Sequence, residues 1–241
     1  RRWYEVSKSQ LNLNHKKGDM FDNRKWFPHI KGGTYRKWYG NLVSVVNWQY
    51  DGRDIKNRAA KKYGSYTKRV QSMEFYFQEG VAWTHTTYSQ PFSCRYIPIG
   101  VISNVEGPEI FNLGTLQFLV MGILNSKIMD DIFSRISDSI HYLAGELANY
   151  PIILPKEKDD IEVVNALVLN NISLSKTDWD SFEISWNFQQ HPLIKNTDSI
   201  ADAFTNWKQD CAKHFSQLKA NEEELNRIFI DKKERLFCTK R

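Results

Sequence analysis

Residues 116–134, LQFLVMGILNSKIMDDIFS, decide the fold class, because the spacing of apolar residues changes there. Apolar side chains in this stretch recur every three or four residues, the spacing of one face of an α-helix. They are Leu116, Leu119, Val120, Ile123, Leu124, Ile128 and Ile132. The pattern predicts an amphipathic helix that ends near Ser134, with strands before it and helices after it. The expected fold class is therefore α+β.

The residues before this helix predict a mainly β unit. Residues 1–110 are rich in aromatic and β-branched side chains and are interrupted by glycine and proline. Short runs of this composition predict strands over 42–48, 74–77, 81–87, 92–97 and 100–104. Turns are expected at Lys31-Gly32-Gly33 and at Asp51-Gly52, because glycine adopts backbone conformations that other residues avoid.

The residues after the helix predict a last strand and then more helices. The strand is expected over 150–155, and the charged stretch 156–160 marks a domain boundary. Helices are predicted from Ile161 and over 200–229. The second of them carries a stripe that we expect to be buried, namely Ala203, Phe204, Trp207, Cys211, Phe215, Leu218, Leu225 and Phe229. These patterns predict a mixed α/β domain over 1–155, with short strands and a supporting helix, and a helical region over 156–241.

Charge is distributed unevenly along the chain. The 241 residues carry a net charge of +5, but residues 1–100 hold 18 Lys and Arg against 7 Asp and Glu, whereas the remaining residues hold 15 against 21. The basic half is where a polyanionic partner would bind. No apolar run is long enough to span a membrane, and three cysteines are too few for a disulfide framework or a zinc knuckle. These features predict a cytoplasmic protein with reduced thiols and no membrane partner.

The strongest local signal is the segment 26–41, WFPHIKGGTYRKWYGN. It places Lys31, Arg36 and Lys37 among aromatic residues that include Trp38, around a Gly-Gly turn. Glycine lets the backbone approach a phosphate, cations neutralise the phosphate, and aromatic rings stack on sugars or bases. The alternative is an aromatic cluster that packs a small β core while its lysines point outward.

A second basic run covers residues 54–69 and is expected to be a loop around Gly64-Ser65-Tyr66. Its cations suit phosphate contacts, and the alternative is a loop that is simply solvated. Asn47 and Gln49, on either side of Trp48, are candidate adenine readers where their strand edge is exposed. The candidate nucleic-acid-binding residues of both regions are Lys31, Arg36, Lys37, Trp38, Asn47, Gln49, Lys56, Arg58, Lys61, Lys62, Lys68 and Arg69.

Sequence motifs for catalysis are missing. The chain has no Pro-Pro dipeptide, so it lacks the Asp/Asn-Pro-Pro-aromatic tetrapeptide with which amino-methylating enzymes hold the target amine. It also lacks a glycine-rich fingerprint for the adenosine of a cofactor. Its six histidines are scattered without metal-ligand spacing, and Asp231-Lys232-Lys233 alone does not make a nuclease site. We therefore expect no catalytic, metal-binding or cofactor-binding residue in this chain.

Runs spread over most of the chain resemble one known family. They include WFPHIKGGTYRKWYGN (26–41), VVNWQYDGRDIKN (45–57), FSCRYIPIGVISNVEGPEIF (92–111), LVMGILNSKI (119–128) and TDWDSFEISWNFQQHPLI (177–194). In this collinear order they resemble the BREX-system adenine-specific DNA methyltransferases, the PglX family. Two stretches, ISDSIH (136–141) and KKERLFCTKR (232–241), depart from the family pattern.

The resemblance implies a longer protein of which this chain is a fragment. The family has an N-terminal S-adenosylmethionine-dependent methyltransferase domain, which is absent here, followed by a target-recognition domain and C-terminal helices. That recognition domain is similar to those of type I and type IIG specificity proteins. The resemblance further implies that 124–127, LNSK, lies in a helix that supports the strands, and that 32–41, GGTYRKWYGN, lies close to DNA. We expect the chain alone to bind no cofactor and to be inactive.

The residues and the resemblance together predict sequence-specific recognition of double-stranded DNA, as the specificity portion of a methyltransferase of a phage-defence system. The expected partners are duplex DNA and the missing methyltransferase domain. Two alternatives stay open. One is a protein-interaction module that docks the methyltransferase on other defence components through the acidic region 156–241. The other is a binder of RNA or single strands.

The predicted DNA-binding surface carries an expectation about stability. Arg36 and Lys37 are expected to be exposed, so replacing both with alanine should weaken DNA binding and leave the melting temperature nearly unchanged. A helical stripe is expected to bury Trp207 and Phe215, so truncating either should do the reverse.

Overall fold

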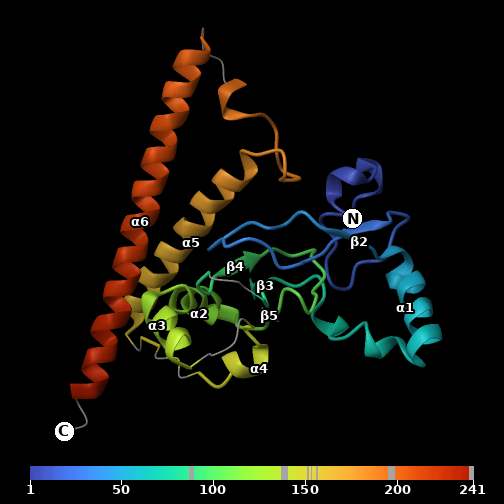
Figure 1. Cartoon of the computed structure of the whole chain (residues 1–241), viewed down its shortest axis with the longest axis horizontal. Helices are drawn as coiled ribbons and strands as arrows, with labels where there is room; N and C mark the ends of the chain where they lie inside the picture. Colours follow the sequence, from blue (N-terminus) through green and yellow to red (C-terminus); the bar gives the residue numbers. More distant parts are fainter. Residues whose placement is uncertain are drawn as a thin grey trace.

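The computed structural model describes residues 1–86, 90–136, 141–150, 152, 154–155, 157–194 and 199–238, apart from the side chains of 136 and 232–238. Its helices within these residues are α1 (Gln49–Tyr63), α2 (Gln117–Leu124), α3 (Lys127–Ile136), α4 (Ala144–Leu147), α5 (Lys158–Asp180) and α6 (Ile200–Cys238). Its strands are β1 (Trp26–Pro28), β2 (Val45–Asn47), β3 (Gly80–Trp83), β4 (Cys94–Ile97) and β5 (Glu109–Ile110). Short strands precede long helices (Figure 1), so the predicted α+β class is confirmed.

The strands form two small antiparallel sheets. β1 pairs with β2, and β3 lies between β4 and β5. Within the second sheet, Ala82 of β3 is the partner of both Arg95 and Glu109, so these three side chains share one face. The opposite face of this sheet packs on α2, where Tyr96 contacts Phe118 and the Cys94 thiol lies against Met121.

Several strand predictions need correction. Residues 73–75, overlapping the run expected as a strand over 74–77, form a turn of 3₁₀ helix. The run expected over 100–104 makes only isolated bridges, at Ile102 and Asn104. Parts of the strands expected over 81–87 and 150–155, namely Thr87, Pro151 and Ile153, lie outside the described residues.

The helix predicted over 116–134 is two helices, and Asn125 separates them. Its side-chain amide donates to the carbonyl oxygen of Cys94 at 3.0 Å, and its Oδ1 accepts the Cys94 N–H at 2.9 Å. Asn125 thus bonds to both the backbone N–H and the carbonyl oxygen of Cys94, as a residue of a neighbouring strand would. This pairing accounts for a polar residue inside an apolar run. Ser126, also buried, closes the end of α2 through a bond from its hydroxyl to the Ile123 carbonyl at 2.6 Å.

The long helices pack on the same core as the sheet. α5 crosses α2 closely, because Gly122 has no side chain: a Cβ there would lie 3.0 Å from Val168. Val164 and Val168 of α5, together with Leu225 and Phe229 of α6, belong to the core cluster that contains β3 and β4. One hydrophobic core therefore joins residues on both sides of position 155. The division into 1–155 and 156–241 stays a prediction.

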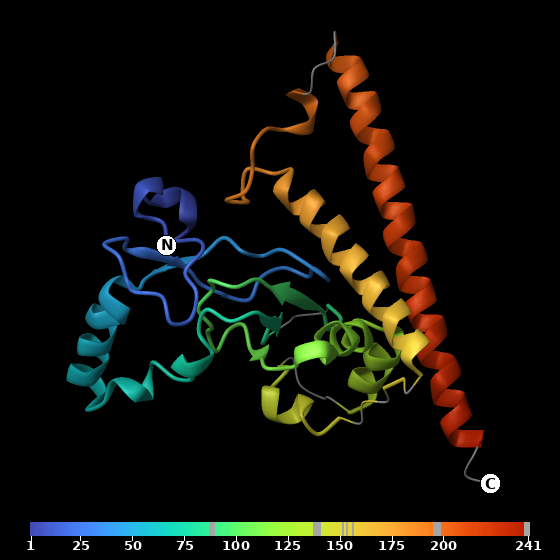
Figure 2. The same cartoon turned by 180° about the vertical axis from the view of Figure 1, so that it is seen from behind.

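The stripe predicted on α6 is only partly buried. Leu225 and Phe229 are each 2% exposed, but Phe204 is 53% and Phe215 is 68% exposed. The reason is the path of the helices: α5 and α6 run side by side near α2 and α3 and diverge toward the start of α6 (Figures 1 and 2). Ala203, Leu225 and Phe229 of the predicted stripe are buried, but the expectation that Phe204, Cys211 and Phe215 are buried is wrong.

A second core, rich in aromatic residues, lies in the N-terminal lobe, the part of the molecule that contains β1, β2 and α1. Its buried members are Phe27, Trp48, Val70, Tyr76, Phe77 and Ile102. His15 is also buried and lies within ring-contact distance of Phe21, Phe27 and Phe77. This small core supports α1 at the far side of the molecule from α5 and α6 (Figure 1). In the part of the chain that the structure describes, no helix is long and apolar enough to cross a bilayer.

Candidate nucleic-acid interface

The basic run 54–69 is mostly helical, which corrects the expected loop. Most of it lies in α1, which ends at Gly64, where the φ of +81° is favourable for glycine. Ala59 and Ala60 are strong helix formers, and Ala59 is buried beneath the helix. A 3₁₀ turn over 66–68 follows and packs on α1. Most of the cations of this run therefore lie on α1 or on the 3₁₀ turn that follows it.

The entry to α1 is a left-handed turn. Tyr50, Asp51 and Gly52 have φ values of 51°, 58° and 67°, and the right-handed helix begins after them. Gly52 packs on the ring of Trp48, where a Cβ would lie 2.8 Å from the indole. The turn therefore agrees with the expected Asp51-Gly52 turn. It also directs Asp51 toward Lys56, whose Nζ lies 2.5 Å from the carboxylate.

Aromatic rings hold several of the α1 cations in place. Lys62 and Arg69 both lie over the ring of Tyr63, at 5.3 and 4.6 Å from its centroid. Arg69 also donates to the Tyr63 hydroxyl at 3.2 Å. Lys56 lies 5.5 Å from the ring centroid of Trp48 and 5.7 Å from that of Tyr66. Cation–π contacts reduce the freedom of these long side chains.

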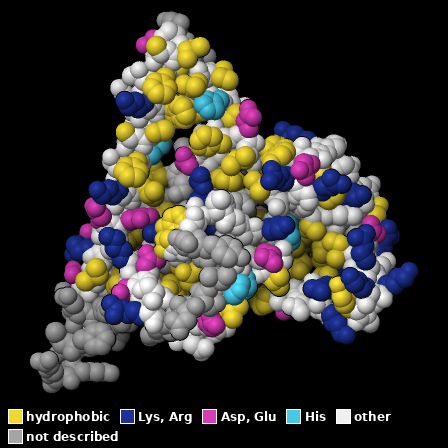
Figure 3. Space-filling view, in the orientation of Figure 1, with side chains coloured by type: hydrophobic (Ala, Val, Ile, Leu, Met, Phe, Trp, Pro, Cys, Tyr) yellow, Lys and Arg dark blue, Asp and Glu magenta, His cyan; other side chains and the backbone are white. Residues whose placement is uncertain are grey.

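Five exposed cations of this surface form no ion pair with a carboxylate in the described residues. They are Arg58, Lys61, Lys62, Lys68 and Arg69. We call these five the α1 patch. Lys and Arg gather over this side of the molecule in the space-filling view (Figure 3). Such a surface creates a positive potential that attracts a polyanion.

Asn47 and Gln49 lie where β2 meets α1, next to the α1 patch in sequence. Both are partly exposed and both already have partners. The amide of Asn47 lies 3.5 Å from a carboxylate oxygen of Asp54, and the amide of Gln49 donates to the carbonyl of Asn23 at 2.8 Å. Reading a base with either amide requires exchanging these bonds.

The other predicted residues lie elsewhere, against α5 and α6. Arg36 pairs with Asp178 of α5 at 3.0 Å and lies over the ring of Trp179 at 5.0 Å. Lys37 donates to the Asn125 carbonyl at 3.0 Å and lies 3.5 Å from Glu222 of α6. The expectation that these two cations are free surface groups is therefore corrected, because both connect the 31–41 loop to the long helices.

Trp38 is also part of this connection. Its ring is 1% exposed, and its Nε1 donates to Glu222 Oε1 at 2.7 Å. A ring enclosed in this way is not available for stacking on a base in this conformation. Of the residues predicted in the 26–41 segment, Lys31 remains exposed.

A cavity of about 510 Å³ opens beside this connection. It lies between the 35–38 segment, α5 and the diverging half of α6, and its apolar lining includes Leu174, Trp207, Phe215 and Leu218. Hydrophobic side chains gather over the same end of the molecule in Figure 3. The cavity and the exposed part of the α6 stripe form one apolar surface.

Sequence reasoning missed two buried charged groups in the second sheet. Arg95 is 1% exposed, although its β4 neighbours are mostly apolar. Glu109 lies on β5, where one carboxylate oxygen is enclosed and without a hydrogen bond, and burial raises the pKa of this carboxyl to about 8. A single charged residue inside an otherwise apolar strand pattern was the available signal. In the described residues no cluster of His, Cys, Asp or Glu is placed to hold a metal ion.

Comparison with known proteins gives a consistent family assignment. No family model matches the chain. The "Adenine-specific methyltransferase PglX" of Lacticaseibacillus casei (strain Zhang) is 34% identical over 238 residues, covering 96% of this chain and 19% of that protein. The "Adenine-specific methyltransferase BrxX" of Escherichia coli O9:H4 (strain HS) is 30% identical over 231 residues, covering 95% of this chain and 18% of that protein.

The chain thus spans about a fifth of the length of these relatives. The two matches cover nearly all of this chain, including the α1 patch, the 31–41 loop and the long helices. Over nearly all of its length, the chain is therefore homologous to a segment of the adenine-specific methyltransferases PglX and BrxX.

Proposed function

We propose that this chain is the DNA-recognition segment of an adenine-specific methyltransferase of a phage-defence system, and that it binds duplex DNA through the α1 patch. The observation that carries the proposal is a set of five exposed cations without ion pairs in the described residues, on α1 and the 3₁₀ turn that follows it, next to the aromatic core. Proteins bind DNA largely by neutralising phosphates and releasing counterions. The family relationship supports DNA as the polyanion.

Helix α1 has the dimensions for this role. The major groove of DNA is about 12 Å wide and admits one α-helix. Arg58, Lys61 and Lys62 lie within one turn of each other on the exposed side of α1, while Ala59 faces the lobe. In this arrangement the cations contact the phosphates on either side of the groove, and Asn47 and Gln49 at the start of the helix are candidate base readers.

Methyl transfer belongs to the remainder of the polypeptide. An enzyme that modifies a base inside a duplex extrudes the base into a pocket. Sequence motifs for the methyl donor and for the target amine are missing from this chain. In the proposed division of labour, this segment fixes the position on DNA and the missing S-adenosylmethionine-dependent domain carries out the reaction.

Fluorescence anisotropy with a labelled duplex tests the proposal. The chain is expected to bind weakly and with little sequence preference, and its affinity falls steeply between about 50 and 200 mM salt because counterions are released. Replacing Lys61, Lys62 and Lys68 with glutamine reduces the steepness of log affinity against log salt by roughly 0.9 for each phosphate that is no longer neutralised. Binding that is absent at low salt, or equally tight to single strands, contradicts the proposal.

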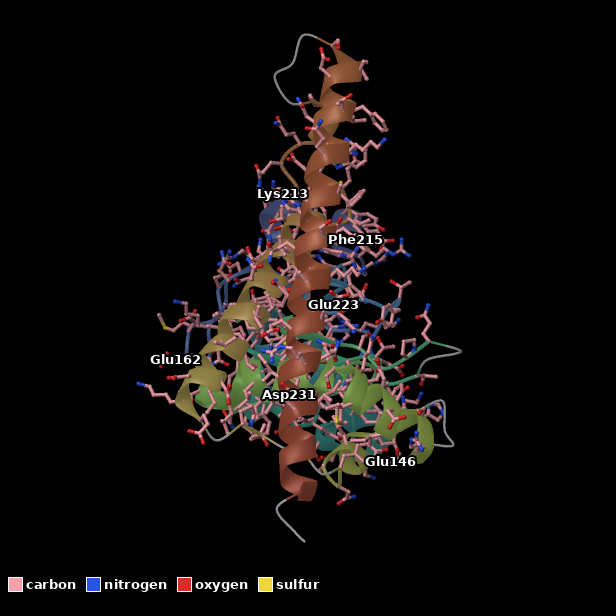
Figure 4. All side chains as sticks on the ribbon, turned by 90° about the vertical axis from the view of Figure 1, so that its left-hand side faces the viewer. Glu146, Glu162, Lys213, Phe215, Glu223 and Asp231 are labelled. Carbon is pink, nitrogen blue, oxygen red and sulfur yellow. The ribbon has the colours of Figure 1, made fainter. Side chains whose placement is uncertain are left out.

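A matched control comes from α6. Lys208, Lys213 and Lys219 are exposed on this helix, with Lys213 labelled in Figure 4, and replacing them with glutamine removes the same charge far from α1. If both triple variants lose affinity equally, net charge rather than the α1 patch accounts for binding. Isothermal titration with S-adenosylmethionine completes the test, and saturable binding at one site means that a cofactor site was missed.

A second function, protein docking, is favoured by the apolar surface of α6. Phe204 and Phe215 are more than half exposed beside the 510 Å³ cavity. Since the relatives are about five times longer, we propose that the methyltransferase portion of the same polypeptide covers this surface. Hydrogen exchange in the longer protein is then slower over 204–218 than in the isolated chain. Equal exchange in both would favour another protein as the partner.

A further inference from the structure

Arg95 is a buried cation that forms no ion pair within the described residues. It lies on β4 and is 1% exposed. One guanidinium nitrogen donates to the Thr84 hydroxyl at 3.3 Å, while Nη2 has no acceptor within the described residues. Buried charges in proteins are normally paired because desolvation is costly. Burial, with a smaller contribution from Arg36, lowers the pKa of Arg95 to about 10, so the group still carries its charge at neutral pH.

The sheet itself does not neutralise Arg95. Glu109 lies in the same row and on the same face, but Ala82 of β3 separates the two residues. Burial raises the pKa of the Glu109 carboxyl to about 8, which favours its neutral form, and one of its oxygens has no hydrogen bond in the described residues. The arrangement therefore holds a positive charge under the surface of the free chain.

Hydrogen bonds connect Arg95 to the loop above it. Arg95 donates to Thr84 Oγ1, and the Thr84 hydroxyl donates to the carbonyl oxygen of Gly33 at 3.3 Å. The Gly33 carbonyl and the Thr34 N–H belong to one peptide group. A charge-assisted chain that withdraws electron density at the carbonyl makes the N–H of the same peptide a stronger donor.

The loop presents donors to solvent. Gly33 and Thr34 are exposed, and their N–H groups have no acceptor among the described residues. Lys31 is exposed nearby and forms no ion pair in the same part of the chain. Close packing fixes the loop, because a Cβ on Gly32 would lie 2.9 Å from the Glu106 carbonyl and one on Gly33 would lie 2.6 Å from Asn41. Free backbone N–H groups in a fixed turn form a concavity that suits an anion.

We propose that the Lys31–Thr34 loop binds a phosphate, and that Arg95 beneath it supplies the positive charge which the phosphate neutralises. Arg95 acts as a positioning residue: it polarises the Gly33–Thr34 peptide through Thr84 and does not touch the ligand. The inference rests on the proposed function and deepens it by assigning one backbone phosphate of DNA to this loop, separate from the α1 patch. The backbone phosphodiester of DNA and inorganic phosphate share the anionic oxygens that the loop recognises.

Amide NMR of the chain tests this site directly. Inorganic phosphate, titrated at constant ionic strength against chloride, is expected to shift the amide signals of Gly33 and Thr34. A short duplex at low salt is expected to shift the same signals. The Arg95→Met variant, close in volume but neutral, binds phosphate roughly tenfold more weakly, as expected when a charge-assisted interaction is removed. Arg95→Lys, which keeps the charge, retains part of the affinity.

A second variant keeps the test valid if Arg95→Met does not fold. Lys31→Ala changes an exposed residue and is expected to weaken phosphate binding without lowering the melting temperature. Amide signals of Gly33 and Thr34 that do not respond to phosphate in the unchanged chain overturn the proposal, as does an unaltered response in Arg95→Met. A response to phosphate without any binding of duplex confirms the site and contradicts the proposed DNA-binding function, so the two failures are distinguishable.

Discussion

Glu222 is expected to be the residue of α6 whose loss most disturbs the N-terminal half. Its Oε1 accepts the indole N–H of Trp38 at 2.7 Å, and its Oε2 lies 3.5 Å from Lys37 Nζ. The Trp38 ring is 1% exposed, and Glu222→Ala leaves its indole N–H without its protein acceptor. A buried donor left unsatisfied costs about 1–3 kcal/mol. Loss of the half-buried ion pair adds up to about 1 kcal/mol, giving a total of about 1–4 kcal/mol.

Thermal unfolding, followed by the fluorescence of the buried tryptophans, measures this cost. For a chain of this size, about 1–4 kcal/mol lowers the melting temperature by roughly 2–16 °C. Glu222→Gln keeps an acceptor for Trp38 and is expected to lose about 1 kcal/mol. The control is Glu223→Ala, because the Glu223 side chain (labelled in Figure 4) is 67% exposed and pairs with Lys219 of the same helix. Equal melting temperatures for Glu222→Ala and Glu223→Ala would refute the reasoning.

Three further predictions follow from burial. Phe229→Ala is expected to cost about 3–5 kcal/mol, because Phe229 is 2% exposed. By contrast, Phe215→Ala should cost less than about 1 kcal/mol, because Phe215 is 68% exposed, and paired urea melts compare the two. Gly122→Val is expected to destabilise the chain by forcing α2 away from Val168, and circular dichroism melts would show no change if that packing were loose. The pKa of Glu109 is raised by burial to about 8. Its contribution to stability is therefore greatest below about pH 4.5 and is lost as pH rises toward 8. Glu109→Gln should gain melting temperature relative to the unchanged chain between about pH 5 and 8, and parallel pH profiles would contradict this.

Local patterns predicted the long helices well. The three- and four-residue spacing of apolar side chains predicted a helix over 200–229, and α6 contains all of that range. The same spacing could not reveal the interruption at Asn125, because the cause lies in β4, 31 residues earlier in the chain. For the basic run 54–69, glycine and serine suggested a loop, whereas tertiary packing of Ile55 on the aromatic core favours a helix.

The residues of the candidate site could likewise be predicted only in part. Composition located the cations of the α1 patch, because charge excess is a property of the sequence alone. It could not separate them from Arg36 and Lys37, whose carboxylate partners are supplied by α5 and α6. Composition could not identify Arg95 either, because whether a charged side chain is buried and unpaired depends on its surroundings in the folded chain.

The sequence by itself determined the fold class, the basic character of the N-terminal half and the family. Each of these depends on residue identity and on spacing along the chain. Only the tertiary structure decided which cations remain free and which aromatic residues are enclosed. Trp38 and Glu222 are 184 residues apart in sequence and 2.7 Å apart in space. Burial and charge pairing depend on such long-range contacts, because the cost of desolvating a polar group is set by its surroundings and not by its neighbours in the chain.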